Sequence, residues 1–413
     1  MTKEYQEGGI DINPSVKEQL LIYPVEQLQP VSKDFKALRI GIPRENSEFE
    51  KRIALRPEAV EILVRRGHQI MVETNAGRDA KFEDREFSEA GATIAYSAKE
   101  VFESDLVLKI EPPTDEEIGF MKPGKTLISA IQMAKLRPEY LRLLLKKKLT
   151  AVAFEMIQDK EGGMPAVRTM SEIAGSTVML IAAEYLSSHN DGKGIILGGV
   201  TGVPSTKVVV IGAGTVGEFA TRTALGLGAE IKVFDRQIYK LRRLKYSVGH
   251  HNLYTSTIDH ITLSESIARA DVVIGAVRAD KGRSPIIVTE EMVRRMKPNS
   301  VIIDVCIDQG GCVETSEITN LKNPVFKKHG VIHYCVPNIA SRVSRTSSTA
   351  LSNIFAPYLL EIGEKGGADE MIFSNKWFMH GVYAYKGSLT NGDLAKKFNM
   401  PHKDLGLLMA ARL

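Results

Sequence analysis

Short apolar runs alternate with amphipathic stretches through the first part of the chain. The strand-like runs lie at residues 37–42, 68–73, 93–95, 105–110, 126–130 and 151–154. The stretches with helical periodicity between them lie at 58–67, 84–90, 115–121 and 138–148. Strands that alternate with helices at this spacing predict a parallel, doubly wound sheet.

A second unit with the same alternation follows a long helical stretch at residues 172–188. Its strand-like runs lie at 208–211, 230–234, 271–276 and 301–305, with a helical pattern at 289–296. From about Thr346 the chain is helical and punctuated by glycines, and we expect it to return to the first unit. The sequence therefore predicts an α/β fold with two Rossmann-like, doubly wound parallel-sheet domains and a cleft between them.

The second unit carries a glycine-rich turn between its first strand and the helix that follows. Residues 207–235 read KVVVIGAGTVGEFATRTALGLGAEIKVFD, with the G-x-G-x-x-G spacing at Gly212, Gly214 and Gly217 and with Thr215 inside the turn. Glycines at these places allow a tight turn, a close approach of backbone N–H groups to a pyrophosphate, and close packing of the helix on the strand.

An acidic side chain ends the next strand. Asp235 follows Gly217 by 18 residues, a position where a carboxylate accepts hydrogen bonds from the adenosine ribose and repels a 2′-phosphate. The neighbouring Arg236 could meet such a phosphate, so NADP stays open as an alternative. The whole pattern predicts a nicotinamide dinucleotide site with a preference for NAD.

The position of this motif divides the chain into three predicted parts. Residues 166–344 form an NAD-binding domain, and residues 38–165 together with 345–413 form a substrate domain. Residues 1–37 form an N-terminal extension that prolines interrupt. This extension is either a disordered tail or, because of its apolar cluster Leu20–Val25, an arm that docks on its own or a neighbouring subunit.

Composition and charge exclude several classes of protein. The 413 residues are 43% hydrophobic and 25% charged, with a formal net charge of +4, as is typical of globular proteins. No basic tract suits nucleic acid, and no apolar run approaches the ~20 residues of a membrane span. Residues 1–20 lack the apolar core of a signal peptide. We therefore expect a cytoplasmic protein without nucleic-acid or membrane partners.

Some polar residues of the second domain are best interpreted as part of its core. Cys306, Cys312 and Cys335 are odd in number and form no CxxC pair, so they predict reduced thiols. Cys306 and Cys312 could ligate a metal, but no histidine cluster joins them, and no metal is expected. His333 on an apolar strand is interpreted as a core histidine, whereas Asn338 could bind the cofactor.

Other polar residues follow predicted strands. Asp308, just beyond residues 301–305, could orient a substrate amine or stabilise a developing positive charge, or it could cap its own loop. Arg52 suits a small carboxylate, although arginines are more often solvated surface groups. Lys109 and Glu111, two apart in one predicted strand, could form a structural ion pair or line the cleft.

Five motifs make the chain resemble a known family. They are GIPRENSEFEKRIALRP, RTMSEIAG, VVVIGAGTVG, VIIDVCIDQGGC and HYCVPN. They look like alanine dehydrogenase and its relative, the NAD-binding subunit of proton-translocating transhydrogenase, and are closer to the former. The resemblance runs from about Leu38 to the C-terminus. It implies a substrate in the cleft, NAD as cofactor, and conversion of L-alanine, water and NAD⁺ into pyruvate, ammonium and NADH. It also implies a homo-oligomer, a hexamer or a dimer, with the helix at 172–188 in the contact.

The resemblance also implies roles for single residues. Arg52 matches the family's substrate-carboxylate arginine, Asp308 its active-site aspartate beside the nicotinamide, and Ser171 a serine that contacts the cofactor phosphates. Further residues match positions where the family touches the dinucleotide: Val216, Lys240, Val277, Ile307, Val336 and Asn338.

Two positions depart from the family pattern. Glu111 stands where alanine dehydrogenases carry a catalytic lysine that holds the keto oxygen, and Gln132 stands where they carry a proton-donating histidine. Lys109 could reach into the cleft instead, but it better matches a structural lysine of both relatives. A catalytically altered NAD(H)-binding homologue, transhydrogenase-like or acting as a sensor or assembly partner, therefore stays open beside an amino-acid dehydrogenase.

Overall fold

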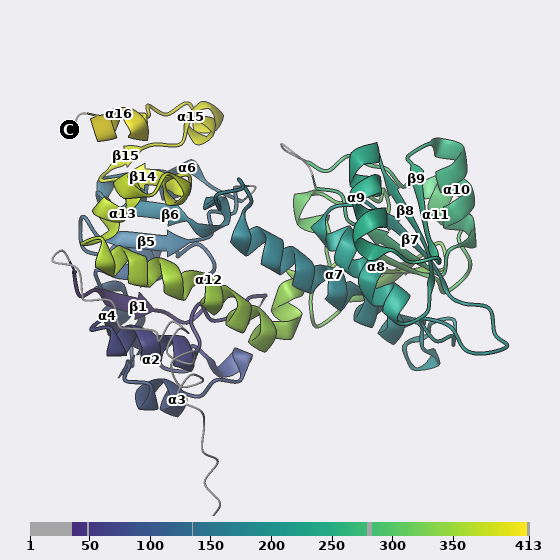
Figure 1. The fold of residues 1–413 in the computed structure, drawn as a ribbon, viewed down its shortest axis with the longest axis horizontal. Coiled ribbons are helices and arrows are strands. Elements are labelled where there is room, and N and C mark those ends of the chain that lie inside the picture. Colours follow the sequence, from purple (N-terminus) through teal and green to yellow (C-terminus); the bar gives the residue numbers. More distant parts are fainter. Residues whose placement is uncertain (1–34, 48, 134, 279–282, 411–413) are drawn as a thin grey trace, which may run out of the picture.

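The computed structural model of the protein describes residues 35–47, 49–133, 135–278 and 283–410. Two lobes lie side by side, each built on one sheet, and the long helix α7 (Pro165–Leu186) runs from one to the other (Figure 1). A second long helix, α12 (Ser344–Glu364), lies against the first lobe. The predicted domain limits fall at the first turns of these two helices.

The first lobe contains an eight-stranded sheet in the order β15-β14-β6-β5-β4-β1-β2-β3. Its strands are β1 (Arg39–Ile42), β2 (Gln69–Glu73), β3 (Thr93–Ala95), β4 (Leu106–Leu108), β5 (Thr126–Ser129), β6 (Thr150–Ala153), β14 (Val382–Tyr385) and β15 (Ser388–Leu389). Besides α12, its helices are α2 (Pro57–Arg65), α3 (Asp84–Glu89), α4 (Ala98–Phe102), α5 (Asp115–Phe120), α6 (Pro138–Lys146), α13 (Ala368–Ser374), α14 (Lys376–Met379), α15 (Gly392–Phe398) and α16 (Leu405–Ala410). Successive buried side chains of β4 to β6 enter two different hydrophobic clusters, so both faces of this sheet are covered.

The second lobe contains a seven-stranded sheet in the order β12-β13-β11-β10-β7-β8-β9. Its strands are β7 (Lys207–Ile211), β8 (Glu230–Asp235), β9 (Leu253–Thr257), β10 (Val272–Gly275), β11 (Val301–Asp304), β12 (Val325–Lys328) and β13 (Val331–Tyr334). Its helices, besides α7, are α8 (Thr215–Gly226), α9 (Ile238–Val248), α10 (His260–Arg269) and α11 (Glu290–Arg294). The β-branched run of β7 divides its side chains between the clusters on the two faces of the sheet.

Both sheets reverse their strand order at one point. The first sheet grows from β1 through β2 to β3, and the chain then returns to the other side of β1 as β4. The second sheet does the same with β7, β8, β9 and β10. Ligands of open α/β sheets bind at the carboxyl ends of the strands beside such a reversal. The loops after β1, β4, β7 and β10 are therefore the places to look for a site.

The prediction of two doubly wound parallel sheets is confirmed, and the structure adds antiparallel strands at their edges. These strands are β12 beside β13, β14 beside β6, and β15 beside β14. The segment after Thr346, predicted as helical, contains β14 and β15 because the apolar run Val382–Tyr385 is buried against β6. The sequence patterns also miss β9, of which Leu253 alone is fully buried, so that no apolar alternation marks it.

Two predicted element limits are wrong in ways that matter for the site. The strand predicted at 105–110 ends at Leu108, so Lys109 and Glu111 lie in the loop after β4 rather than on one face of a strand. The helix predicted at 172–188 begins at Pro165, whose fixed φ suits a first helical turn.

The N-terminal cluster Leu20–Val25 lies outside the described residues. No helix in the described part of the chain combines the length and the apolar character that crossing a bilayer requires.

Candidate functional site

The turn between β7 and α8 opens onto a cavity of about 650 Å³. Gly212 has a φ of +108°, and a Cβ there would lie 2.4 Å from the carbonyl oxygen of Ala276. A Cβ on Gly217 would lie 1.9 Å from the carbonyl oxygen of Gly212, so glycine is required for α8 to start this close to the strand. A Cβ on Gly214 would meet nothing within 4 Å and would point into open space. These glycines fit a pyrophosphate at the N-terminus of α8.

Most of the predicted cofactor residues line this cavity. They are Ser171, Gly212, Gly214, Thr215, Val216, Asp235, Arg236, Lys240 and Val277. Sequence reasoning missed three further cations in its wall: Arg168, Arg278 and Arg283. These guanidinium groups suit the negative charge of a dinucleotide. The signal that could have found two of them is the basic loop directly after β10.

Asp235 stabilises the backbone of the site, besides any contact with a ribose. Its carboxylate accepts hydrogen bonds from the backbone N–H groups of Ala213 and Gln237, each at 2.8 Å. It therefore braces the glycine turn as well as the loop after β8. A carboxylate has about four acceptor positions, so capacity remains for the hydroxyl groups of a ribose.

The other predicted cofactor residues do not line this cavity. Gly217 packs against the carbonyl oxygen of Gly212, Ile307 is buried, and Val336 is buried in a hydrophobic cluster of the second lobe. Asn338 donates hydrogen bonds from Nδ2 to the carbonyl oxygen of Phe49 and to Glu50 Oε2, at 3.2 and 3.0 Å. It therefore bridges the two lobes.

The loop after β1 holds Arg52 in a buried ion pair. Glu50 accepts from Arg52 Nε at 2.6 Å and from Nη2 at 2.5 Å, so one edge of the guanidinium fork is occupied. Burial disfavours the charged form of Glu50, but the Arg52 guanidinium outweighs it and lowers the pKa of the Glu50 carboxyl. Arg52 Nη1 lies 3.2 Å from the sulfur of Met170. Because Arg has five N–H donors, part of the fork remains available to a ligand carboxylate.

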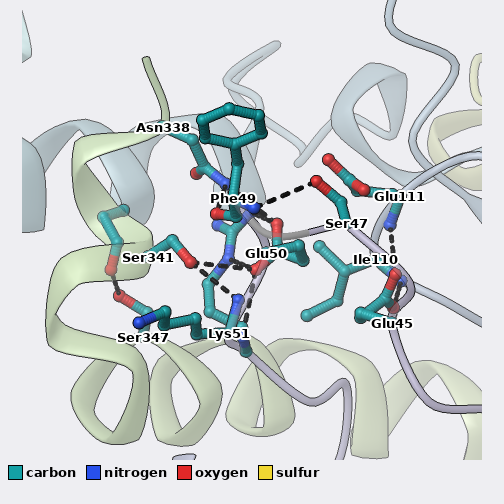
Figure 2. Close-up of polar contacts among 12 residues, drawn as sticks. Glu45, Ser47, Phe49, Glu50, Lys51, Ile110, Glu111, Asn338, Ser341 and Ser347 are labelled. Carbon is teal, nitrogen blue, oxygen red and sulfur yellow. Dashed lines mark hydrogen bonds and ion pairs between the residues drawn. The ribbon is translucent and has the colours of Figure 1, made fainter. Parts of the chain in front are cut away.

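Glu50 also ties this loop to the second lobe. Figure 2 shows its carboxylate between Asn338, which precedes the 3-10 turn (Ile339–Val343), and Ser341, which belongs to this turn before α12. The backbone N–H of Lys51 donates to Ser341 Oγ at 2.8 Å, next to these contacts. The loop of Arg52 is thus fixed to the segment that follows β13.

Lys109 pairs with Glu45 and not with Glu111. Its Nζ lies 2.5 Å from Glu45 Oε2, and both side chains are buried. Burial, with a smaller contribution from Glu50, raises the pKa of Glu45 to about 7, although the Lys109 ammonium opposes the shift. Glu45 also accepts from the backbone N–H groups of Ile110 and Glu111 (Figure 2). Lys109 is therefore a structural cation that secures the loop after β4.

Glu111 and Gln132 lie together on the wall of a second cavity, of about 300 Å³. Glu111 follows β4, and Gln132 follows the neighbouring strand β5. Burial, with help from Glu50, raises the pKa of Glu111 above its ordinary value. Gln132 has a φ of +45°, unusual for a residue other than glycine. The residues at the two departures from the family pattern are thus neighbours in space.

Asp308 lies beyond β11, in a short 3-10 turn (Ile307–Gln309), and its side chain is exposed. Partial desolvation by the surrounding protein raises the pKa of the Asp308 carboxyl, and the Lys135 ammonium opposes that shift. Because Lys135 belongs to the loop after β5, Asp308 lies within electrostatic range of the first lobe.

A buried cluster lies beneath this turn. The ligand atoms of Asp304, Cys306 and Cys312 lie within 4.8 Å of one another. Asp304 already accepts from the Cys306 thiol and from the backbone N–H groups of Cys312 and Val313. A hydrogen bond with Cys306, together with burial, raises the pKa of the Cys312 thiol. Metals bind the thiolate form, so we continue to expect no resident metal here.

His333 is a fully buried residue whose two ring nitrogens both have partners. Nε2 lies 2.8 Å from Thr315 Oγ1, and Nδ1 lies 3.0 Å from the carbonyl oxygen of Val331. Burial lowers the pKa of His333 to about 4. The side chain belongs to the core of the second lobe, as its apolar strand predicts.

Sequence reasoning missed the partners that set the charge state of the first lobe's site. These are Glu45 and Glu50, both in the motif that holds Arg52, and Lys135, three residues after Gln132. Their closeness in sequence to predicted site residues was the available signal.

Comparison with known proteins gives concordant results. Family models described as "Alanine dehydrogenase/PNT, N-terminal domain" and "Alanine dehydrogenase/PNT, C-terminal domain" match residues 41–174 and 178–392. Alanine dehydrogenase 2 of Staphylococcus aureus strain USA300 is 39% identical over 369 residues, which are 89% of this chain and 98% of that protein.

Solved structures agree with these matches. An L-alanine dehydrogenase superposes with a TM-score of 0.82 at 33% identity, covering 87% of this chain and 99% of that one. A transhydrogenase from Sinorhizobium meliloti shares the fold, with a TM-score of 0.74 at 24% identity over 86% of this chain and 99% of that one. The family models and the curated relative match most of both lobes. The chain therefore belongs to the alanine dehydrogenase/PNT family of NAD-dependent oxidoreductases.

Proposed function

We propose that the protein catalyses the reversible oxidative deamination of a small L-amino acid, with L-alanine as the first candidate. L-alanine, water and NAD⁺ would give pyruvate, ammonium, NADH and a proton. The observation that carries this proposal is the retention of Arg52 and Asp308 in a chain that is 39% identical to an alanine dehydrogenase.

The chain's own groups can be assigned to parts of this reaction. Arg52, held on one edge by Glu50, offers its remaining donors to the substrate carboxylate. Asp308, exposed beyond β11, is suited to orient the substrate amine. NAD, when bound in the cavity beside the glycine turn, accepts the hydride that leaves the substrate α-carbon.

An absorbance assay at the NADH wavelength tests the proposal directly. We expect NADH formation with L-alanine and NAD⁺, and NADH consumption with pyruvate and ammonium. The panel should include other small amino acids and their keto acids, because the second cavity borders Glu111 and Gln132. Absence of turnover with the whole panel, from a protein that binds NADH, would reject the proposed activity.

A second candidate function is a non-catalytic NAD(H)-binding protein. The observation that favours it is the presence of Glu111 and Gln132 where the family carries lysine and histidine. Removal of one acid–base group typically costs about 10²–10⁴-fold in rate. Tight NADH binding without turnover would support this candidate. In that case the paired change Glu111→Lys and Gln132→His should restore activity if the remainder of the site is intact.

A further inference from the structure

The cations at the carboxyl edge of the first sheet differ in whether they already have a partner. Arg52 is held by Glu50 and Lys109 by Glu45, each with a nitrogen–oxygen distance of 2.5 Å. Within the described residues, the Lys135 side chain forms neither an ion pair nor a hydrogen bond, and it is exposed. Lys135 is therefore a cation at this edge whose whole ammonium group remains available to a ligand, whereas Arg52 offers only part of its guanidinium fork.

Lys135 lies beside Glu111. Both line the cavity of about 300 Å³, together with Ser47 and Gln132. Their loops follow β5 and β4, which are adjacent parallel strands, so the two loops leave the sheet at the same edge. The charge of Lys135 also acts on Asp308 of the second lobe. The lining of this cavity comes from the first lobe, and Asp308 lies within electrostatic range of its cation.

The backbone turn that carries Lys135 is held in place from below. The backbone N–H groups of Ile131 and Gln132 both donate to Glu155 Oε1, at 2.8 and 3.3 Å. The N–H of Lys135 then donates to the carbonyl oxygen of Gln132 at 2.9 Å. A left-handed conformation such as that of Gln132 is unfavourable for a residue with a side chain and persists where the surrounding structure enforces it. The hydrogen bonds to Glu155 and within the turn therefore fix the position of the backbone that carries Lys135.

Glu111 has the electrostatic setting of a proton acceptor. Burial and Glu50 raise the pKa of Glu111, whereas Lys109 and Lys135 pull it down, and Arg52 is also close enough to interact with it. A carboxyl group whose pKa lies above the ordinary value accepts a proton more effectively near neutral pH.

On the basis of the amino-acid dehydrogenase function proposed above, we propose that Glu111 takes a proton from the substrate ammonium group and that Lys135 supplies the cation beside the substrate's carbonyl oxygen. This pair does the work for which alanine dehydrogenases carry a lysine and a histidine. Glu111 and Lys135 are then catalytic residues of this chain, and Lys109 is not.

The proton step balances. A carboxylate oxygen of Glu111 forms an O–H bond as one N–H bond of the ammonium breaks, and the electron pair stays on nitrogen. The neutral amine has a lone pair, which the ammonium lacks. This lone pair helps to expel the α-hydrogen as a hydride. Glu111 then releases its proton to water, which accounts for the one proton that the reaction produces. After the hydride has left, water adds to the iminium carbon, a carbon–oxygen bond forms, and one proton of the water moves to nitrogen. Lys135 keeps its proton and stabilises this oxygen as the carbon–nitrogen bond breaks, and the remaining hydroxyl proton leaves on nitrogen as ammonium.

The role of Lys135 is tested with Lys135→Met, Lys135→Arg and the control Lys146→Met. Lys146 is also exposed, at the last turn of α6. We expect Lys135→Met to weaken productive binding of pyruvate about 10- to 100-fold, the effect of losing a charged hydrogen bond, without changing the NADH dissociation constant. Lys135→Arg should recover much of the loss, and Lys146→Met should match the parent. Unchanged pyruvate kinetics in Lys135→Met would overturn the role.

The role of Glu111 is tested by the pH profile of L-alanine oxidation. We expect kcat/KM to rise with pH as Glu111 of the free enzyme ionises, with a midpoint above the ordinary carboxyl value. Glu111→Gln should lower kcat about 10²–10⁴-fold and remove this limb, whereas Glu111→Asp should keep it. The control Glu116→Gln changes an exposed glutamate of α5. If the rate of Glu111→Gln still rises with pH in the same range, another group accepts the proton and the role of Glu111 is overturned.

Binding measurements separate failure of this inference from failure of the proposed function. If the parent turns over no amino or keto acid, the proposed function fails and the proton step of Glu111 fails with it. Calorimetry of pyruvate added to the NADH complex then decides the part of Lys135. Loss of pyruvate binding in Lys135→Met supports the contact, and equal binding in the parent and the variant overturns it.

Discussion

At the scale of single residues, buried carboxylates determine which cations of the site can meet a ligand. Glu50 occupies one edge of the Arg52 guanidinium, and Glu45 forms a buried ion pair with Lys109. The sequence predicts Arg52 as a site residue because the segment GIPRENSEFEKRIALRP, which contains it, resembles a motif of the family. It could not predict these pairings, because the geometry of the loop after β1 decides which carboxylate meets which cation.

Nucleotide choice depends on Asp235. We expect NADH to bind at least ~10-fold more tightly than NADPH, because repulsion of a 2′-phosphate by about 1.4 kcal/mol or more gives that ratio. Asp235→Asn should narrow the gap by removing the charge while keeping one acceptor oxygen. Asp235→Ala should weaken both nucleotides, since it also removes the brace on Ala213. Fluorescence titration of the parent and the two variants with each nucleotide measures the six dissociation constants, and equal affinities in the parent would assign recognition to Arg236 instead.

The buried His333 makes stability depend on pH. Its pKa is about 4 in the native state, below its ordinary value of 6.5, so the unfolded chain takes up a proton first as the pH falls. The contribution is fully present above pH 6.5 and is lost between pH 6.5 and pH 4, by about 3 kcal/mol. Urea unfolding of the parent and His333→Gln at a series of pH values measures it. The same pH slope in both proteins would contradict the assignment.

At the scale of elements, the contact between α7 and α8 places the cofactor turn. Gly175 of α7 faces the first turn of α8, where a Cβ would lie 2.4 Å from the carbonyl oxygen of Val216 and 2.8 Å from Phe219 Cβ. The two helices can approach this closely only because that position has no side chain. The same α7 carries Ser171 into the wall of the dinucleotide cavity.

Substitution of this glycine should disturb both the packing and the cofactor site. We expect Gly175→Ala to destabilise the fold by about 1–3 kcal/mol, the usual cost of overpacking, and to weaken NADH binding by displacing Val216. Gly226→Ala on α8 is the matched control, because a Cβ there meets nothing within 4 Å. It should be neutral or stabilising by up to about 1 kcal/mol. Equal unfolding free energies for the two variants would refute the packing argument.

The sequence predicted those elements that have a clear apolar period or a motif. The strands β1, β7, β10 and β11 and the glycine turn are of this kind, since each strand is nearly continuous apolar sequence. The edge strand β9 and the returning strands β14 and β15 escaped prediction. Their pairing depends on a sheet built by distant residues, which no local pattern records.

At the scale of the whole molecule, the two sheets bring their switch points together. Residues after β1, β4 and β5 supply the charged groups of the first lobe, and residues after β7 and β11 supply the glycine turn and Asp308. The sequence predicted which loops would carry chemistry. Lys135 belongs to the first lobe and Asp308 to the second. Their electrostatic interaction depends on how the two lobes are placed, so the sequence pattern of one lobe alone could not predict it.

Assembly is a prediction at this scale. Val178 and Ile181 of α7, expected in a subunit contact, are buried within their own lobe, whereas Leu180 is 58% exposed. We expect a dimer or a larger oligomer, and Leu180→Glu should lower its mass if α7 builds the contact. Light scattering coupled to size exclusion decides, with Ile261→Glu of α10 as a control, because Ile261 is also exposed, at 71%. The same measurement on a chain that starts at Lys36 tests the extension, and a monomeric parent would refute the prediction.

The hydrogen bonds from the loop of Arg52 to Asn338 and Ser341 have a thermodynamic consequence. A ligand that steadies the segment after β13 would also steady the arginine that would meet the substrate. Such a linkage is reciprocal by necessity: if NADH tightens the keto acid by some factor, the keto acid tightens NADH by the same factor. The two ligands then bind as a cooperative pair, and a cell's ratio of oxidised to reduced nucleotide would set the apparent affinity for the substrate.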